Sequence, residues 1–184
     1  MIIGVIIHFN HVLTDVGPLC ARLKARGHPV RFFANAGEAK HAYHSPYRYP
    51  EHMRAVPYDT LDWYHSNAEL GDMLRRSDVK AVFVEEVIPC CLEPVHFQNR
   101  SYSIFNIVHS VDNFHPKGIA GGVLDVSFVG YEKYGEYLGW DKKDYVALGL
   151  PKYDILSSLD PVAIRKKYAL PEKYILLLTP NSDL

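Results

Sequence analysis

Apolar runs typical of buried strands alternate with segments of helical periodicity along most of the chain. The first run, Met1–Phe9, is rich in Ile and Val and ends in polar residues. In Val16–Arg26 the apolar residues recur at helical spacing until Gly27, and His28–Ala34 is again typical of a strand. A strand, a helix and a strand in this order predict a right-handed crossover between two parallel strands.

The same alternation continues further along the chain. It predicts helices at Leu61–Arg76 and Glu132–Leu138. The further strands that we expect are Arg54–Tyr58, Lys80–Val87, Tyr102–Val108, Val123–Val129 and Tyr145–Leu148. With about seven strands in all, the pattern predicts an α/β fold with a Rossmann-like, doubly wound parallel sheet.

A break in the pattern falls at Gly149–Asp160, where a Gly-Leu-Pro turn precedes a new helix at Pro161–Tyr168 and a new strand at Tyr174–Leu178. We therefore expect one domain over residues 1–150, followed over residues 151–184 by a linker, a helix and the first strand of a second domain. The segment His41–Pro57 has neither period, and it predicts a long loop.

Composition narrows the class of protein. The 184 residues include 20 Lys+Arg and 21 Asp+Glu, and 48% are hydrophobic, which excludes a disordered chain and a strongly basic nucleic-acid binder. No apolar run approaches the roughly 20 residues that span a bilayer, so we expect no integral membrane segment. Cys20, Cys90 and Cys91 lack a C-x-x-C spacing, and they predict reduced thiols and a cytoplasmic location, with attachment to a membrane surface left open.

Candidate catalytic residues follow the predicted strands. Because the carboxyl ends of parallel strands meet at one edge of a sheet, polar residues just after each strand should converge there. This rule collects His8, Asn10, His11, Glu85, Glu86, His109 and Asp112. An imidazole beside a carboxylate can act as a general base, so we predict His109 as the base with Asp112 or Glu86 as its partner. The alternative is a histidine that only caps the strand end.

Asn10, His11 and Glu85 are predicted to contact the substrate, and so is Lys117, which precedes a glycine-rich segment. That segment could cradle a phosphate or simply connect two elements. The first turn has no G-x-G-x-x-G pattern, so the sequence predicts no nicotinamide or flavin cofactor. The histidines of the long loop have no carboxylate at a suitable spacing, and we expect no metal site.

The last third of the chain carries a more specific pattern, which runs from LDVSFVGYEKYGEYLGW through DKKDYVALGLPKYDIL to DPVAIRKKYALPEKYILLLTP. It resembles the junction between the two domains of GT-B glycosyltransferases, with CDP-glycerol glycerophosphotransferase-like and related polysaccharide transferases as the most similar group. The matching positions are Asp125, Gly149, Pro151, Asp154, Arg165, Thr179 and Pro180.

This resemblance implies a GT-B N-terminal domain that binds a sugar or polyol acceptor in surface polysaccharide synthesis. The nucleotide-sugar donor would bind only with a C-terminal domain that begins near Tyr174, so the isolated chain would be inactive and hold no cofactor. The family's catalytic histidine matches His109, although Ser110 stands where the family often has glycine. Two alternatives remain open: a sugar-nucleotide 2-epimerase-like domain, and a non-catalytic module that presents Tyr43, Tyr47 and Tyr49 to a partner.

Overall fold

The computed structural model describes residues 1–7, 12–36, 56–85, 92–108, 123–149 and 159–171. The chain forms two compact units, Met1–Tyr153 and Asp154–Leu184. In the second unit, Asp160 caps the N-terminus of α5 (Pro161–Lys167), and its Oδ1 accepts a hydrogen bond from Val162 N at 2.8 Å. Among the described helices, none combines the length and the apolar character that crossing a membrane requires.

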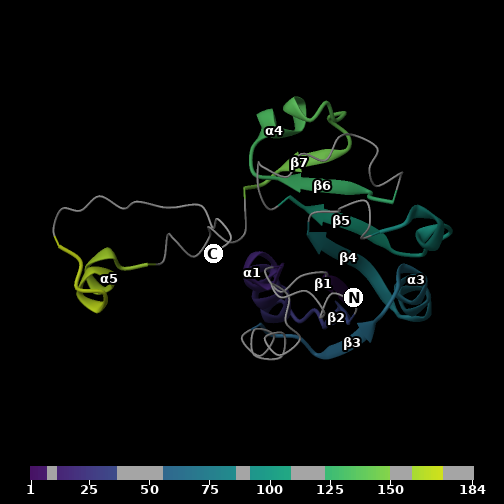
Figure 1. Ribbon diagram of the computed structural model, residues 1–184, viewed down its shortest axis with the longest axis horizontal. Coiled ribbons are helices and arrows are strands. Elements are labelled where there is room, and N and C mark those ends of the chain that lie inside the picture. The colour runs from purple at the N-terminus through teal and green to yellow at the C-terminus, as the bar shows by residue number, and fades with distance from the viewer. Residues whose placement is uncertain (8–11, 37–55, 86–91, 109–122, 150–158, 172–184) are drawn as a thin grey trace, which may run out of the picture. The chain divides into compact units, whose positions relative to one another are not determined.

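A seven-stranded sheet forms the centre of the first unit (Figure 1). The strand order is β3-β2-β1-β4-β5-β6-β7, and all six neighbouring pairs are parallel. The strands are β1 (Ile2–Ile7), β2 (Val30–Asn35), β3 (Thr60–Tyr64), β4 (Val79–Glu85), β5 (Ser103–Ile107), β6 (Val126–Val129) and β7 (Tyr145–Ala147). The Rossmann-like, doubly wound α/β fold expected from the sequence is confirmed.

The helices cover both faces of this sheet. On one face α1 (Val12–Ala25) packs Val16 and Cys20 against β1 and β2 side chains such as Val5 and Phe32. On the other face α3 (Asn67–Arg76) buries Leu70 and Leu74 together with apolar residues of β1, β2 and β4. A third cluster joins α4 (Glu132–Tyr137) to the ends of β6 and β7. Burial of these side chains provides the main stabilising free energy of the fold.

A close approach fixes the position of η3 (Pro94–Phe97), the 3-10 helix that precedes β5. A Cβ atom at Gly71 of α3 would lie only 2.4 Å from the carbonyl oxygen of His96, so glycine is required there. The same carbonyl accepts a hydrogen bond from Arg75 Nη1 at 2.7 Å. The helix α3 therefore holds the turn from which β5 starts.

The third strand differs from its sequence-based prediction. The sequence predicts it at Arg54–Tyr58, but β3 is formed by Thr60–Tyr64, and residues 54 and 55 lie outside the described part. The sequence instead predicts that Leu61 begins a helix. The error arises because β3 is a half-exposed edge strand, in which polar and apolar residues are mixed. The helix begins only after Ser66, whose Oγ accepts a hydrogen bond from Glu69 N at 3.2 Å.

Most other elements lie where the pattern predicts them. The first helix begins earlier than expected, at Val12 rather than Val16, and β6 begins three residues later, at Val126. The strand expected at Tyr174–Leu178 and most of the loop His41–Pro57 lie outside the described residues.

The same hydrogen-bonding motif occurs twice at the amino edge of the sheet. Asp59, just before β3, donates its backbone N–H to Val30 O and accepts the N–H of Val30 on Oδ2 at 2.7 Å. Asp125, just before β6, makes the same two contacts with Ile104, again at 2.7 Å to Oδ2. A cation completes each motif, Lys24 at Asp59 and Arg100 at Asp125. We call these two arrangements the aspartate clamps.

Candidate functional site

The strand order reverses between β1 and β4, and this reversal marks the place where a ligand can bind. From β1 the chain proceeds to β2 and β3 on one side, and from β4 it proceeds to β5, β6 and β7 on the other. In open parallel sheets, ligands usually bind beyond the carboxyl ends of the two strands at such a reversal, which here are β1 and β4. The arrowheads of β4, β5 and β6 point to the same side in Figure 1.

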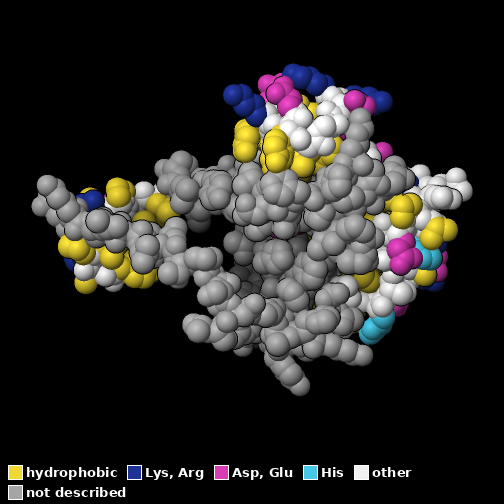
Figure 2. Space-filling model, turned by 45° about the horizontal axis from the view of Figure 1, so that its top comes forward, with side chains coloured by type: hydrophobic (Ala, Val, Ile, Leu, Met, Phe, Trp, Pro, Cys, Tyr) yellow, Lys and Arg dark blue, Asp and Glu magenta, His cyan; other side chains and the backbone are white. Residues whose placement is uncertain are grey.

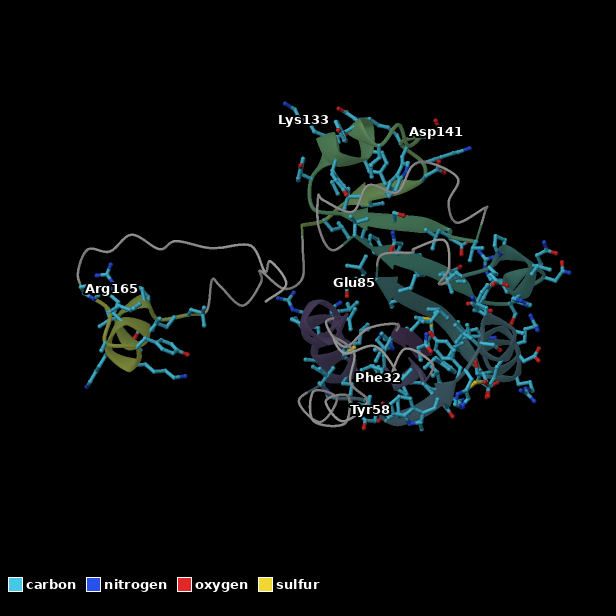
Figure 3. The ribbon with its side chains drawn as sticks, viewed as in Figure 1. Phe32, Tyr58, Glu85, Lys133, Asp141 and Arg165 are labelled. Carbon is cyan, nitrogen blue, oxygen red and sulfur yellow. The ribbon has the colours of Figure 1, made fainter. Side chains whose placement is uncertain are left out.

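Glu85 is the last residue of β4 and therefore lies at the carboxyl end of a strand that borders this reversal (Figure 3). It is paired in register with Ile107 and lies on the same face of the sheet, the face that packs against α1. Only 1% of its surface is exposed. Because a buried carboxylate is costly to desolvate, such a residue is usually kept for a specific interaction. Glu85 is thus a candidate for binding a polar ligand.

A buried polar pair lies on the opposite face of the sheet, where Asn106 of β5 is in register with Ser127 of β6. Asn106 and Ser127 are 5% and 4% exposed, and Asn106 Nδ2 lies 3.5 Å from Ser127 Oγ. The other amide atom, Asn106 Oδ1, is buried and finds no hydrogen-bond partner among the residues that the structure describes. An unsatisfied buried acceptor costs free energy, which marks Asn106 as a second candidate for a functional role. The strand-end rule does not predict this pair, although a lone Asn within the apolar strand SIFNI is a usable signal.

The structure describes only one of the predicted site residues. Glu85 lies at the carboxyl edge of the sheet, as the strand-end rule predicts. The remaining seven lie outside the described residues, so their predicted convergence stays a prediction: His8, Asn10, His11, Glu86, His109, Asp112 and Lys117.

The thiol of Cys20 has no part in this chemistry. It is a free cysteine, fully buried between α1 and the sheet. Burial raises its pKa to about 12, so the thiol stays protonated and unreactive at neutral pH. This agrees with the reduced thiol expected from the sequence, whereas Cys90 and Cys91 lie outside the described residues.

Several solved structures share this fold, among them two epimerases and a glycosyltransferase. The UDP-N-acetylglucosamine 2-epimerase from Rickettsia bellii is 13% identical, with a TM-score of 0.64 over 93% of this chain and 52% of that chain. The putative UDP-N-acetylglucosamine 2-epimerase from Listeria monocytogenes is 11% identical, with a TM-score of 0.60 over 90% and 50%. The glycosyltransferase from Rickettsia africae ESF-5 is 12% identical, with a TM-score of 0.57 over 93% and 50%.

These similarities define the fold of the chain. At 11–13% identity they show a Rossmann-like sheet of the GT-B type, and this chain spans about half the length of each of the three proteins. No family model matches the sequence, and no curated protein matches it. The resemblance to CDP-glycerol transferases stays an expectation, because the three structures named above are two epimerases and a glycosyltransferase and show only the fold.

Proposed function

We propose that this chain is the acceptor-binding domain of a transferase that uses a nucleotide-sugar or nucleotide-polyol donor in surface polysaccharide synthesis. The observation that carries the proposal is the burial of Glu85 at the point where the strand order reverses. A buried carboxylate at this edge suits a sugar or polyol, because it can accept hydrogen bonds from hydroxyl groups. The similarity to a glycosyltransferase over half of that protein's length supports the same proposal.

In the proposed mechanism His109 removes the proton from the acceptor hydroxyl, and Asp112 or Glu86 orients its imidazole. Asn10, His11 and Glu85 hold the acceptor, and Lys117 adds a positive charge near the transferred group. The donor binds to the other half of the complete enzyme. As the acceptor oxygen bonds to the transferred group, the bond between that group and the nucleotide breaks. The nucleotide then leaves, as a nucleoside diphosphate from a nucleoside diphosphate sugar or as a nucleoside monophosphate when a polyol phosphate is transferred. No cofactor takes part in this reaction, and the chain alone is catalytically silent.

Acceptor binding tests the proposal directly. Saturation-transfer NMR with a panel of sugars and polyols is expected to show weak binding to the 184-residue chain. Glu85→Gln should weaken that binding about tenfold or more, because the amide keeps the shape and loses the charge. Glu136→Gln is the matched control, because Glu136 is an exposed carboxylate on α4. Equal binding by the two variants, at unchanged stability, would contradict the role of Glu85.

A sugar-nucleotide 2-epimerase domain is the second candidate, favoured by the similarity to two epimerases. Inversion at C2 of the sugar must break the C2–H bond, whereas transfer to an acceptor leaves this bond intact. With the complete enzyme in D2O, deuterium entering C2 of UDP-N-acetylglucosamine would favour the epimerase. Transfer of the sugar to an added acceptor without such exchange would favour the transferase.

A further inference from the structure

An open polar cleft lies at the amino edge of the sheet, at the opposite end of β4 from Glu85. Its volume is about 540 Å³, and it is lined by Lys80, the turn Asn99–Tyr102, Ser103 and Asp125. Lys80 precedes Glu85 by five positions on the same strand, which corresponds to about 17 Å. The cleft is therefore separate from the proposed acceptor site, and a ligand can bind in it whether or not Glu85 binds an acceptor.

Arg100 gives this cleft a fixed wall. Its Nε donates a hydrogen bond to Tyr102 O at 3.1 Å, and its Nη1 donates to Phe97 O at 3.2 Å. Its Nη2 lies 2.9 Å from Asp125 Oδ2, the same oxygen that accepts the N–H of Ile104. Three contacts to separate residues hold the guanidinium in one orientation, and only 16% of the side chain is exposed. The walls of the cleft are thus preorganised by the second aspartate clamp.

Lys80 supplies a positive charge that the lining does not neutralise. Arg100 is already paired with Asp125, and among the described residues Lys80 has no carboxylate partner. The side chains of Ser101, Ser103 and Asn99 add hydroxyl and amide donors to the lining. One cation in excess, surrounded by neutral donors, is a lining that suits a small anion with several acceptor oxygens.

We propose that this cleft binds a phosphate group, either free or at the end of a small organic molecule. Lys80 supplies the attractive charge as a point cation, and the serine and asparagine side chains donate hydrogen bonds to the remaining oxygens. Arg100 shapes the wall and keeps its own charge balanced by Asp125. Nothing at the carboxyl edge of the sheet is needed for this binding.

Titration of the 184-residue chain with inorganic phosphate, followed through backbone amide signals in ¹⁵N NMR, tests this assignment. The signals of residues 99–103 should shift in a saturable way, with a Kd in the millimolar range or tighter, on the order of 1 mM. Lys80→Gln should raise that Kd about tenfold, the effect of losing one well-placed charged contact. The matched control is Lys133→Gln, because Lys133 is an exposed lysine on α4 (Figure 3).

Each outcome decides the question. A saturable shift that Lys80→Gln weakens and Lys133→Gln leaves unchanged supports the cleft as a phosphate site. Equal weakening by both variants would show only a general attraction between charges, and absent shifts at residues 99–103 would show no binding there; either result overturns the proposal. A parallel titration with methyl phosphate distinguishes the sources, since tighter binding of methyl phosphate indicates a phosphomonoester and weaker binding indicates free phosphate.

Discussion

The two edges of the sheet treat their polar groups differently. At the amino edge each aspartate clamp pairs a carboxylate with a backbone N–H and a cation, so the charge is balanced locally. At the carboxyl edge Glu85 and Asn106 are buried near the strand ends, and within the described part of the chain Asn106 Oδ1 has no hydrogen-bond partner. The comparison teaches that the carboxylates of the amino edge are balanced by local partners, whereas the carboxyl edge buries at least one polar atom, Asn106 Oδ1, whose burial reduces stability.

The region of α4 and β7 in the first unit carries exposed apolar side chains. Figure 2 shows hydrophobic side chains gathered in the region of α4 and β7, next to Lys, Arg, Asp and Glu side chains. The exposed apolar residues of this region include Tyr131, Tyr137, Val146 and Leu148. The charged side chains beside them, such as the Glu132–Lys142 ion pair, limit edge-to-edge association through the short strand β7.

The largest expected effect on stability comes from removing the second aspartate clamp at the amino edge. Asp125→Ala removes the acceptor of the Ile104 N–H and the partner of Arg100, which is only 16% exposed. We expect the free energy of unfolding to fall by about 2 kcal/mol, because a partly buried donor and a charge lose their partner. Urea denaturation measures this change. A loss below about 0.5 kcal/mol would show that the clamp does not stabilise this edge.

A double substitution at the carboxyl edge should act in the opposite direction. Asn106→Val together with Ser127→Ala removes the buried polar pair and the unsatisfied Oδ1 atom. Because apolar groups of similar size replace both partners, we expect the free energy of unfolding to rise by about 1 kcal/mol. The same denaturation experiment applies. A decrease in the free energy of unfolding would contradict the claim that the buried polar pair reduces stability. It would instead indicate that Asn106 and Ser127 serve only in packing.

A smaller effect is expected at the first clamp, where the stability that Asp59 contributes should depend on pH. The hydrogen bonds from Lys24 and from Val30 N hold the pKa of Asp59 below its ordinary value of 3.8. A lowered folded-state pKa contributes stability above about pH 4, and this stability is lost as the pH falls through the folded-state value. The difference in urea midpoint between wild type and Asp59→Asn should therefore be present at neutral pH and shrink below pH 3.8. A constant difference across this range would rule out the carboxylate charge as its cause.

The smallest effect concerns the cation of the first clamp. Lys24 and Asp59 are 31% and 43% exposed, and such surface ion pairs contribute little to stability. Lys24→Gln should leave the melting temperature of the chain close to that of wild type. The matched change in the second clamp, Arg100→Gln, should lower the melting temperature clearly, because Arg100 also bonds two backbone carbonyls. Equal effects in a thermal melt would remove the distinction between the two clamps.

The sequence predicts the order of strands and helices well, because buried strands such as VKAVFVE are continuous apolar runs. It fails at β3, since a half-exposed edge strand carries no such run. The start of α3 after this strand is nonetheless indicated by the sequence, because Ser66 followed by Glu69 is a typical start of a helix.

The strand-end rule finds Glu85 at the carboxyl edge because this rule depends only on strand direction. It does not find the clamps or the cleft at the amino edge. Those sites combine residues that are remote in sequence, such as Lys80, Arg100 and Asp125, and pairing across strands is what brings them together. The rule misses Asn106 for a different reason, since it considers only residues that follow a strand and Asn106 lies inside β5.

The central position of β1 has a consequence for the order in which this chain can fold during its synthesis. β1 pairs on one side with β2, which is close in sequence, and on the other with β4, where Ile2 meets Val79 and Ile6 meets Val84. The second pairing has to wait until the ribosome has released residues beyond Glu85. Until then the side of β1 that will pair with β4 remains an open strand edge. The nascent chain therefore passes through a stage that is vulnerable to aggregation. Such long-range parallel pairing also makes folding slow, because a large loop must close before the contact forms.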